Sequence, residues 1–489
     1  MSRYFLAFDL GAESGRAMLG RYAGGVISVR EIHRFANEGV RMNGSLQWDI
    51  LRIWAEVKRA FDLVDDVSLE SVGLDTWGVD YALLGERGSL LENPYHYRDT
   101  RTDGMMDAVF ERVSRERIYA VTGIQFLPIN TLFQLYAACV RTPDLIDASR
   151  ALVTIPDLLN YWLTGTLQSE YTVATTTQFI DARSRSWALR MLDEIGLPRR
   201  LLQPLVEPGA VIGPLLESVS RRFRGTPVVA PACHDTASAV ASVALGEHAA
   251  FLSSGTWSLL GCELPAPIIS SAAMASNFTN EGGVAGTTRL LKNIGGLWLL
   301  QACLRHWSEA GQRYDYDTLL AATDDDQLAF RSLIDPDCRA FLHPDDMPGS
   351  IAGYCRQTGQ PEPSSPAAFT RTILESLVFK YRAVLESMEE LTGRRFAEVR
   401  IIGGGARNRL LTQWTADATQ RTVVAGPVEA TALGNLAMQL IATGHASSIE
   451  EARAIVDRSF PIQRFEPRAP ARWESHYKRF REYMEFTCA

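Results

Sequence analysis

Hydrophobic and polar positions follow two alternating patterns along the chain. Residues 51–64 repeat apolar side chains every three or four positions, with Leu51 on the apolar face, and residues 366–391 do the same over a longer span. This spacing predicts amphipathic helices. A short apolar run typical of a buried strand follows each one, at 71–77 and 399–405. Strand and helix patterns alternate throughout, which predicts an α/β fold.

Two pairs of segments resemble each other in the same order. FLAFDLGAESGRAML (5–19) and AAFLSSGTWSLLG (249–261) each predict a strand, a Gly/Ser turn and a second strand. VVAPACHDTASAVA (228–241) and VVAGPVEATALGNLA (423–437) each lead through proline to an acid and a helix of small residues. Chance similarity of short small-residue runs is the alternative, but two matches in one order favour an internal duplication.

Length and composition narrow the classes of protein. A chain of 489 residues exceeds one ordinary domain, and the duplication places the boundary near residue 245, giving domains 1–245 and 246–489. A net charge of −8 argues against nucleic-acid binding. No apolar stretch is long enough to span a membrane. The seven cysteines contain no CxxC pair, which indicates neither a zinc ribbon nor a disulfide framework and fits a reducing cytoplasm.

Two Gly/Ser turns are candidate phosphate-binding sites. DLGAESGR (9–16) and SSGT (253–256) offer backbone N–H groups, which can bind phosphate oxygens without a lysine. A plain turn is the alternative for either one alone. Asp9 ends an apolar strand, where a carboxylate needs a partner. A magnesium ion held through water would account for it, and a hydrogen-bonded turn aspartate is the alternative.

Three consecutive glycines, 403–405, follow a predicted strand. They would let the backbone lie flat against a planar ligand such as adenine, whereas a tight strand-to-helix turn needs only one or two glycines. The GxGxxG spacing of a dinucleotide-binding turn is missing.

His234 and Asp235 stand where an apolar strand ends and a helix of small residues begins. The plain interpretation of an acid at this place is a helix N-cap, which satisfies backbone N–H groups. The alternative is a catalytic carboxylate. The pattern of the residues alone leaves both open.

The ordered set of two hairpins, a Gly-Gly-Gly turn and paired small-residue helices resembles the sugar kinase, actin and Hsp70 fold. Within it the chain resembles the FGGY family of carbohydrate kinases. This resemblance implies two duplicated actin-like, ribonuclease H-like α/β domains around an ATP- and sugar-binding cleft. The matching stretches span nearly the whole chain: DLGAESGR (9–16), DTWGVDYALL (75–84), YRDTRTDGM (97–105), GIQFLPINTLFQL (123–135), ATTTQF (174–179), CHDTASAV (233–240), SSGTWSLLG (253–261), NEGG (280–283), LKNIGGLWLLQ (291–301), GGGARN (403–408) and GPVEATALGN (426–435).

The resemblance also implies site residues. Asp235 would be the general base that accepts a proton from the attacking sugar hydroxyl, and Asp9 would hold Mg²⁺ through water. The implied sugar-binding residues are Asp75, Trp77, Gly78, His234, Asp235 and Thr236. The implied nucleotide-binding residues are Ala12, Glu13, Ser14, Gly15, Arg16, Thr256, Asn293, Gln301 and Gly404.

Alternatives stay open at three of these positions. Core packing is the alternative for Trp77, and a structural histidine is the alternative for His234. An inward Glu13 would repel ATP, so its side chain is expected to point outward or toward the metal ion.

The implied activity is ATP-dependent phosphorylation of L-rhamnulose to L-rhamnulose 1-phosphate, with Mg²⁺. The expected enzyme is cytoplasmic, a monomer or small homo-oligomer, and has neither a nucleic acid nor a membrane as partner. One alternative is another FGGY ketose kinase, acting on L-fuculose, xylulose or a similar sugar. A second is a non-catalytic, Hsp70-like ATP-dependent clamp, which would need no base beside a sugar pocket. A hydrolase using His234 and Asp235 lacks a nucleophile motif such as GxSxG.

Overall fold

The computed structural model describes residues 2–342 and 344–486. These residues form two compact units, each described here by itself. Unit 1 contains the residues up to Ala244 together with Glu263–Leu290 and Glu429–Pro461; unit 2 contains Leu245–Cys262, Leu291–Val428 and the residues from Ile462 onward. Two later segments of the chain return to unit 1, so the two units do not follow a single cut near residue 245. The division into sequence domains 1–245 and 246–489 stays a prediction.

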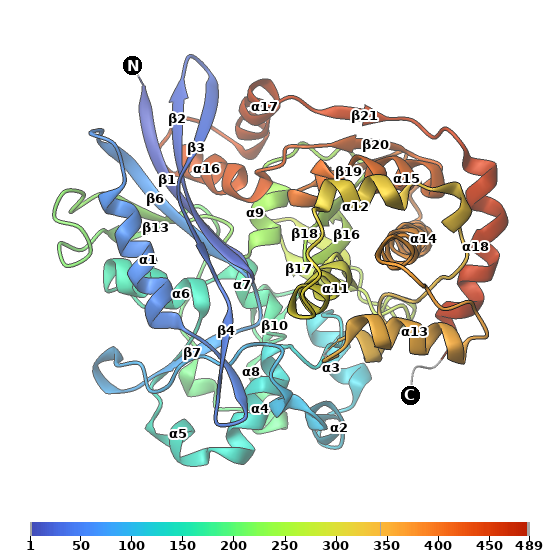
Figure 1. Cartoon of the computed structure of the whole chain (residues 1–489). Coiled ribbons are helices and arrows are strands. Elements are labelled where there is room, and N and C mark those ends of the chain that lie inside the picture. The colour runs from blue at the N-terminus through green and yellow to red at the C-terminus, as the bar shows by residue number, and fades with distance from the viewer. Residues whose placement is uncertain (1, 343, 487–489) are drawn as a thin grey trace. The chain divides into compact units, whose positions relative to one another are not determined.

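Unit 1 is built on a six-stranded sheet in the order β13-β14-β6-β1-β2-β3 (Figure 1). Its strands are β1 (Arg3–Leu10), β2 (Ser14–Ala23), β3 (Val26–Ala36), β6 (Leu69–Thr76), β13 (Ala210–Pro214) and β14 (Pro227–Ala230). Strand β6 runs parallel to β1 and to β14, whereas β2 is antiparallel to β1 and β13 is antiparallel to β14. The carboxyl ends of β14, β6 and β1 therefore meet at one edge of the sheet.

Helices cover both faces of this sheet. Successive side chains of a strand point to opposite faces, and β1 is buried from both sides. Ala7 packs with α16 (Ala430–Ala442) in one apolar cluster. Phe8 points the other way, and its ring lies 5.6 Å from that of Phe61 on α1 (Ile50–Asp62). By the same alternation, Asp9 lies on the same face of the strand as Ala7, toward α16.

The predicted helix at 51–64 is confirmed as α1, but the placement of Leu51 on its apolar face is wrong. Leu51 is 60% exposed. The helix begins one residue earlier, and Ile50, Ile53 and Val57 form the buried face. Side chains three and four positions apart share a helix face, so Ile50 takes the buried place that was assigned to Leu51.

Unit 2 repeats the strand pattern of unit 1. Five strands of its sheet follow one another in the order β16-β15-β19-β20-β21. They are β15 (Ala249–Ser254), β16 (Trp257–Leu264), β19 (Glu398–Ile402), β20 (Thr422–Ala425) and β21 (Gln463–Phe465). The pairings are antiparallel, parallel, parallel and antiparallel, as in β2-β1-β6-β14-β13. Both predicted hairpins and the duplicated strand order are confirmed.

The remaining strands and α-helices are divided between the two units. In unit 1 they are β4 (Gly39–Met42), β5 (Ser45–Trp48), β7 (Tyr81–Leu84), α2 (Met105–Phe110), α3 (Arg115–Thr122), α4 (Thr131–Arg141), α5 (Pro143–Ala148), β8 (Ala151–Thr154), α6 (Ile155–Thr164), β9 (Ser169–Glu170), α7 (Tyr171–Thr176), β10 (Ile180–Asp181), β11 (Ser186–Trp187), α8 (Leu189–Ile195), β12 (Leu205–Val206), α9 (Asp235–Ala241), α10 (Ser271–Ala275), β17 (Thr279–Gly282) and α17 (Ile449–Ser459). In unit 2 they are α11 (Trp298–Glu309), α12 (Tyr316–Thr323), α13 (Met347–Gln357), α14 (Pro366–Thr392), α15 (Arg409–Thr419) and α18 (Pro470–Met484), and β18 (Thr288–Gly295) runs from unit 1 into unit 2.

The two small-residue helices, α9 and α16, pack closely within unit 1. A Cβ atom added to Gly434 would lie only 1.6 Å from the carbonyl oxygen of Ser238. The alanines that open the two helices are buried. Small residues therefore serve a close helix crossing, as the sequence indicated.

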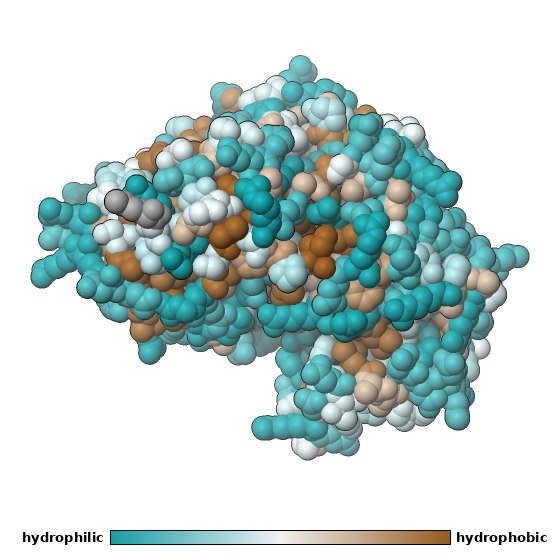
Figure 2. All heavy atoms as spheres, turned by 90° about the horizontal axis from the view of Figure 1, so that it is seen from above, coloured by the Kyte–Doolittle hydropathy of each residue, from teal (hydrophilic) through white to brown (hydrophobic). Residues whose placement is uncertain are grey.

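The surface is polar with dispersed apolar residues. On the face shown in Figure 2, hydrophobic residues lie in small groups among hydrophilic ones. Among the described helices, none combines the length and apolarity needed to cross a bilayer. Cys139, Cys233, Cys262, Cys303 and Cys355 form no disulfide, whereas Cys338 is disulfide-bonded. The remaining cysteine, Cys488, lies outside the described residues.

Candidate active site

Three aspartates meet at the carboxyl edge of the unit 1 sheet. Asp9, near the end of β1, is the register partner of Asp75 on β6. The next residue of β6, Thr76, forms a bridge to His234, so the β14 strand-to-helix turn that carries Asp235 lies against the same edge. The parallel order β14-β6-β1 thus gathers acids from three distant parts of the sequence.

Asp9 is buried in an ion-pair network. Arg16, its register partner on β2, donates hydrogen bonds both to Asp9 and to Glu429, the residue before α16. Burial raises the pKa of Asp9, Arg16 opposes this shift, and the charges of Asp235 and Glu429 add to it. Burial lowers the pKa of Arg16, but Asp9 and Glu429 more than offset that effect, so the guanidinium stays charged. No sequence pattern predicted the Arg16–Glu429 pair, apart from the duplicated acid at the helix start.

Asp75 is completely buried. Its Oδ2 accepts a hydrogen bond of 2.7 Å from Nδ2 of Asn435 on α16, while its Oδ1 has no hydrogen-bond partner among the described residues. Burial, and next the charge of Asp9, raise the pKa of Asp75 well above its ordinary value, and Asp235 contributes. Carboxylates therefore outnumber the Arg16 guanidinium at this edge.

Asp235 is the accessible acid of the three. Its side chain is 31% exposed, compared with 8% for Asp9. Helix α9 begins at Asp235 itself, and His234 occupies the N-cap position without a side-chain cap. Asp235 is therefore the first residue of the helix and not its N-cap. Its Oδ1 accepts hydrogen bonds from the backbone N–H and the hydroxyl of the buried Thr236, at 2.5 and 3.2 Å.

His234 lies between Asp235 and a buried ion pair. Its Nε2 is 3.4 Å from Oδ1 of Asp235, and its Nδ1 is 3.3 Å from Nη2 of Arg289. The same guanidinium nitrogen pairs with Glu281 at 3.1 Å. NEGG (280–283) was among the matching stretches, but sequence reasoning assigned no role to Glu281 or Arg289. The local sequence does not show that Arg289 is buried, so it contained no signal for this residue.

The side chains of the Asp75–Gly78 segment are less exposed than expected for a segment that lines a sugar pocket. Trp77 is only 4% exposed, its Nε1 donates to Oδ2 of Asp80 at 3.0 Å, and its ring centroid lies 4.1 Å from that of Trp48. These contacts favour the core-packing alternative for Trp77. Gly78 is half-buried, and a Cβ atom there would stand 3.0 Å from the side chain of Thr176.

The first hairpin turn is tightly closed. The N–H of Gly11 donates to the carbonyl of Ser14 at 3.0 Å, and the ring of Phe35 leaves no space for a Cβ atom on Gly15, which would lie 2.2 Å away. Ala12 and Ser14 are half-buried, whereas Glu13 is exposed. The turn therefore presents small residues and backbone, with the acidic side chain at the surface.

The second hairpin belongs to unit 2. Thr256, in the turn between β15 and β16, accepts a hydrogen bond of 3.0 Å on its carbonyl oxygen from the N–H of Trp298, the first residue of α11. This helix also carries Gln301, whose Oε1 is buried and has no hydrogen-bond partner among the described residues. Asn293 is on β18, three residues before Gly296, where a Cβ atom would meet the backbone of Trp257 at 2.5 Å. The turn that contains Thr256 is thus hydrogen-bonded to the first residue of the helix that carries Gln301.

Two of the three consecutive glycines have a reason in the fold. Gly403 has a φ of +82°, which disfavours a side chain. A Cβ atom on Gly405 would lie 2.1 Å from Oγ of Ser254. Gly404 is exposed, and a Cβ atom there would have nothing within 4 Å. The turn accounts for Gly403 and Gly405, whereas it gives no steric reason for a glycine at position 404.

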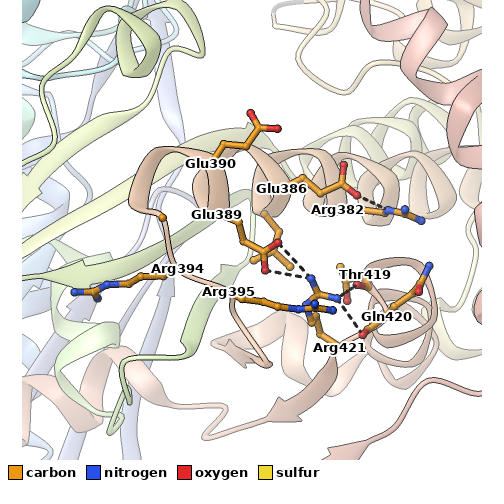
Figure 3. Close-up of a pocket in the computed structure, with 11 residues that line it drawn as sticks. Arg382, Glu386, Glu389, Glu390, Arg394, Arg395, Thr419, Gln420 and Arg421 are labelled. Carbon is orange, nitrogen blue, oxygen red and sulfur yellow. Dashed lines mark hydrogen bonds and ion pairs between the residues drawn. The ribbon is translucent and has the colours of Figure 1, made fainter.

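Another part of unit 2 contains a cavity with charged walls. Within the described ranges, no group of three His, Cys, Asp or Glu side chains is placed to hold a metal ion. A cavity of about 690 Å³ lies at the end of α14, lined by Arg382, Leu385, Glu386, Glu389, Glu390, Gly393, Arg394, Arg395, Thr419, Gln420 and Arg421. Its charges pair with one another, Arg421 with Glu389 at 3.1 Å and Arg382 with Glu386 at 2.8 Å (Figure 3). None of the predicted site residues lines it.

Family models match both parts of the chain. The N-terminal domain of the FGGY family of carbohydrate kinases matches residues 4–242, and its C-terminal domain matches residues 250–443. A rhamnulokinase from Bacteroides thetaiotaomicron is 43% identical over 98% of this chain and 99% of that protein. A rhamnulokinase from Pectobacterium atrosepticum is 43% identical over 97% of this chain and 95% of that protein.

Solved structures of similar fold have much lower sequence identity. A xylulose kinase from Lactobacillus acidophilus, solved with bound ligand, superposes with a TM-score of 0.81 at 16% identity, covering 99% of this chain and 97% of that one. A Plasmodium falciparum glycerol kinase with ADP gives a TM-score of 0.76 at 15% identity, covering 100% and 98%. They confirm the two-domain α/β kinase fold. With both family models matched along almost the whole length, the chain belongs to the FGGY family of carbohydrate kinases, enzymes that use ATP.

Proposed function

We propose that this carbohydrate kinase transfers the γ-phosphate of ATP to L-rhamnulose and forms L-rhamnulose 1-phosphate and ADP. Relatives 43% identical over nearly the full length are rhamnulokinases, which supports this sugar. The observation that carries the chemistry is Asp235. It is the accessible carboxylate at an edge where Asp9 and Asp75 are buried.

Asp235 would act as the general base. Its Oδ1 is engaged by Thr236, and no hydrogen bond to its Oδ2 occurs among the described residues. We assign Oδ2 to the sugar hydroxyl. As the hydroxyl oxygen forms its bond to the γ-phosphorus, its proton passes to Oδ2 and the bond to the departing ADP oxygen breaks. In such a loose transition state the protein's main contributions are positioning and charge stabilisation.

The sugar would be held around Asp235 by neighbours on the same edge. His234 and Thr236 flank the base directly, and Gly78 would let the backbone approach the ligand. Asp75 is too buried to contact the sugar in this state, and we assign it to shaping the charge of the edge. Trp77 would support the turn from the core.

A divalent cation fits this edge. Burial raises the pKa values of Asp9 and Asp75, the charges of the neighbouring carboxylates, Asp235 among them, add to both shifts, and one Asp75 oxygen has no hydrogen-bond partner among the described residues. Mg²⁺ prefers oxygen ligands and keeps several waters, which suits indirect contact with Asp9. When bound, it would neutralise phosphate charge during the transfer.

The nucleotide contacts would come from the hairpin turns and the glycine turn. In unit 1 they are the turn residues Ala12, Glu13, Ser14 and Gly15, with Arg16 on the following strand. In unit 2 they are Thr256, Asn293, Gln301 and Gly404. Small residues and backbone N–H groups at these turns match the needs of a polyphosphate and a flat base.

An ADP-release assay across a panel of ketoses tests the substrate. We expect kcat/KM for L-rhamnulose to exceed that for L-fuculose, D-xylulose and D-ribulose by at least roughly tenfold, since pocket contacts to single groups give discriminations of that size or more. A higher value for another ketose would transfer the assignment to that sugar. ADP release that no sugar stimulates would instead favour the clamp alternative. The proposed enzyme is a monomer or a small homo-oligomer, which size-exclusion chromatography with light scattering distinguishes. We also propose that it is located in the cytoplasm.

A further inference from the structure

Arg289 is a fully buried arginine to which the proposed reaction assigns no role. Its side chain is 0% exposed, and Nη1 has no hydrogen-bond partner among the described residues. Burying a charged group with an unpaired donor is costly, so one ion pair with Glu281 is a weak reason to keep it. Its Nε donates a hydrogen bond of 2.9 Å to the carbonyl of Gly282, and its Nη2 contacts His234, beside the general base.

We propose that Arg289 is a positioning residue that fixes His234 as the tautomer with hydrogen on Nε2. A guanidinium has only donors. Its Nη2 lies 3.3 Å from Nδ1 of His234, and in the neutral ring this contact is a hydrogen bond only when Nδ1 accepts and the ring hydrogen is on Nε2. This inference rests on the proposed function of Asp235.

The competing tautomer is disfavoured on both sides of the ring. With hydrogen on Nδ1, the imidazole could donate to Glu281, whose Oε2 is 3.4 Å away. Two donors, Nδ1–H and Arg289 Nη2–H, would then face each other. On the opposite side the bare Nε2 lone pair would face the Asp235 carboxylate at 3.4 Å. Both contacts become favourable when Nε2 carries the hydrogen.

The Nε2–H group is thereby directed toward the side where the sugar hydroxyl meets Asp235. It can donate a hydrogen bond to the sugar or to the carboxylate, while Asp235 Oδ2 stays free to take the proton. A base whose neighbour is oriented by a third group is a recurring arrangement in catalysis. Here the orienting group is Arg289, about fifty residues further along the chain.

Histidine ¹⁵N chemical shifts measure the tautomer directly. The full chain is labelled with ¹⁵N-histidine, and among its eight histidines the His234 signals are those that disappear in His234→Gln. We expect the Nε2–H form in the wild type and a mixture or the Nδ1–H form in Arg289→Gln. In the same variant kcat/KM for L-rhamnulose should fall roughly 10- to 100-fold, the size expected for misplaced reacting groups. KM for ATP should change less than about twofold, because the altered group does not contact nucleotide.

Arg453→Gln is the matched control. Arg453 is also a buried arginine of unit 1, and it pairs with both oxygens of Glu263 at 2.9 and 2.8 Å, without contact to His234. Its replacement should lower the melting temperature and leave both the tautomer and kcat/KM unchanged. Equal kinetic losses in the two variants would reduce Arg289 to a structural role, and so would full activity of Arg289→Gln.

The proposal stays testable if Arg289→Gln does not fold. Arg289→Lys keeps the charge but loses the planar fork, so it should fold and still lose the tautomer preference. An Nδ1–H signal in the wild type overturns the inference without any variant. Failure of the wild type to phosphorylate any ketose would refute the proposed function instead, and the tautomer measurement does not depend on it.

Discussion

Asp9 and Asp75 are direct neighbours on the parallel strands β1 and β6, and burial together with the charge of Asp9 raises the pKa of Asp75 well above its ordinary value near 3.8. Arg16 counters the charge of both aspartates, and the more distant Arg289 interacts with Asp235. The edge therefore holds more negative charge than the protein alone neutralises. Such unfavourable charge is common where a ligand or ion supplies the missing partner.

Asp75→Asn should change stability in a pH-dependent way. Because the folded-state pKa is raised, the native protein holds this proton more firmly than the unfolded chain. The stability contribution is full below the unfolded pKa and is lost as pH rises through the folded one. The variant should therefore melt at a higher temperature than the wild type at pH 8, and the difference should vanish toward pH 4. Melting curves between pH 4 and pH 8 test this prediction, with Asp103→Asn at an exposed aspartate as the control. A melting temperature of Asp75→Asn below that of the wild type at pH 8 would contradict the charge argument.

Asp235→Asn should lower kcat by roughly 10²- to 10⁴-fold, the usual loss when a general base is removed. Asparagine keeps an oxygen to accept the Thr236 hydrogen bonds, so the fold and the sugar Kd measured by calorimetry should change little. Asp147→Asn, at an exposed aspartate, provides the comparison. Retention of more than about a tenth of the wild-type rate would remove Asp235 from the role of base.

Gly404→Val and Gly405→Ala should have opposite profiles. The valine side chain at 404 enters open space, so the protein should fold normally while KM for ATP rises, by about tenfold if the backbone here contacts the base. At 405 a Cβ atom overlaps Ser254 and should destabilise the fold. Titration with a fluorescent ADP analogue and melting curves separate the two effects. Unchanged nucleotide affinity in a folded Gly404→Val protein would mean that the glycines serve only the turn.

Gly434→Ala should be strongly destabilising. Its methyl group would overlap the Ser238 carbonyl, forcing α9 and α16 apart at a cost of about 1–3 kcal/mol or more. Gly353→Ala in α13, where a Cβ atom meets nothing within 4 Å, should instead stabilise by about 0.5–1 kcal/mol. Urea unfolding of both variants measures the difference. A neutral result for Gly434→Ala would show that the two helices separate without cost.

The sequence by itself determined the repeating architecture. Hairpins, amphipathic helices and small-residue helices have local periods, because each period follows from the geometry of one element. For this reason 5–19 and 249–261 both formed hairpins, and the duplicated order appeared in both sheets. The error at Leu51 shows the limit of such patterns, since one position of helix phase changes which side is buried. Resemblance to a family, rather than any pattern, directed attention to Asp235.

Only the tertiary structure decided the partners of the charged groups. Arg16 and Glu429 are 413 residues apart, and they meet because α16 packs against the sheet that carries the first hairpin. Asn435 reaches Asp75 for the same reason, and Arg289 reaches His234 from a segment that returns to unit 1. No local pattern predicts such pairs, because the partner of a buried charge depends on which distant strands and helices become neighbours when the chain folds.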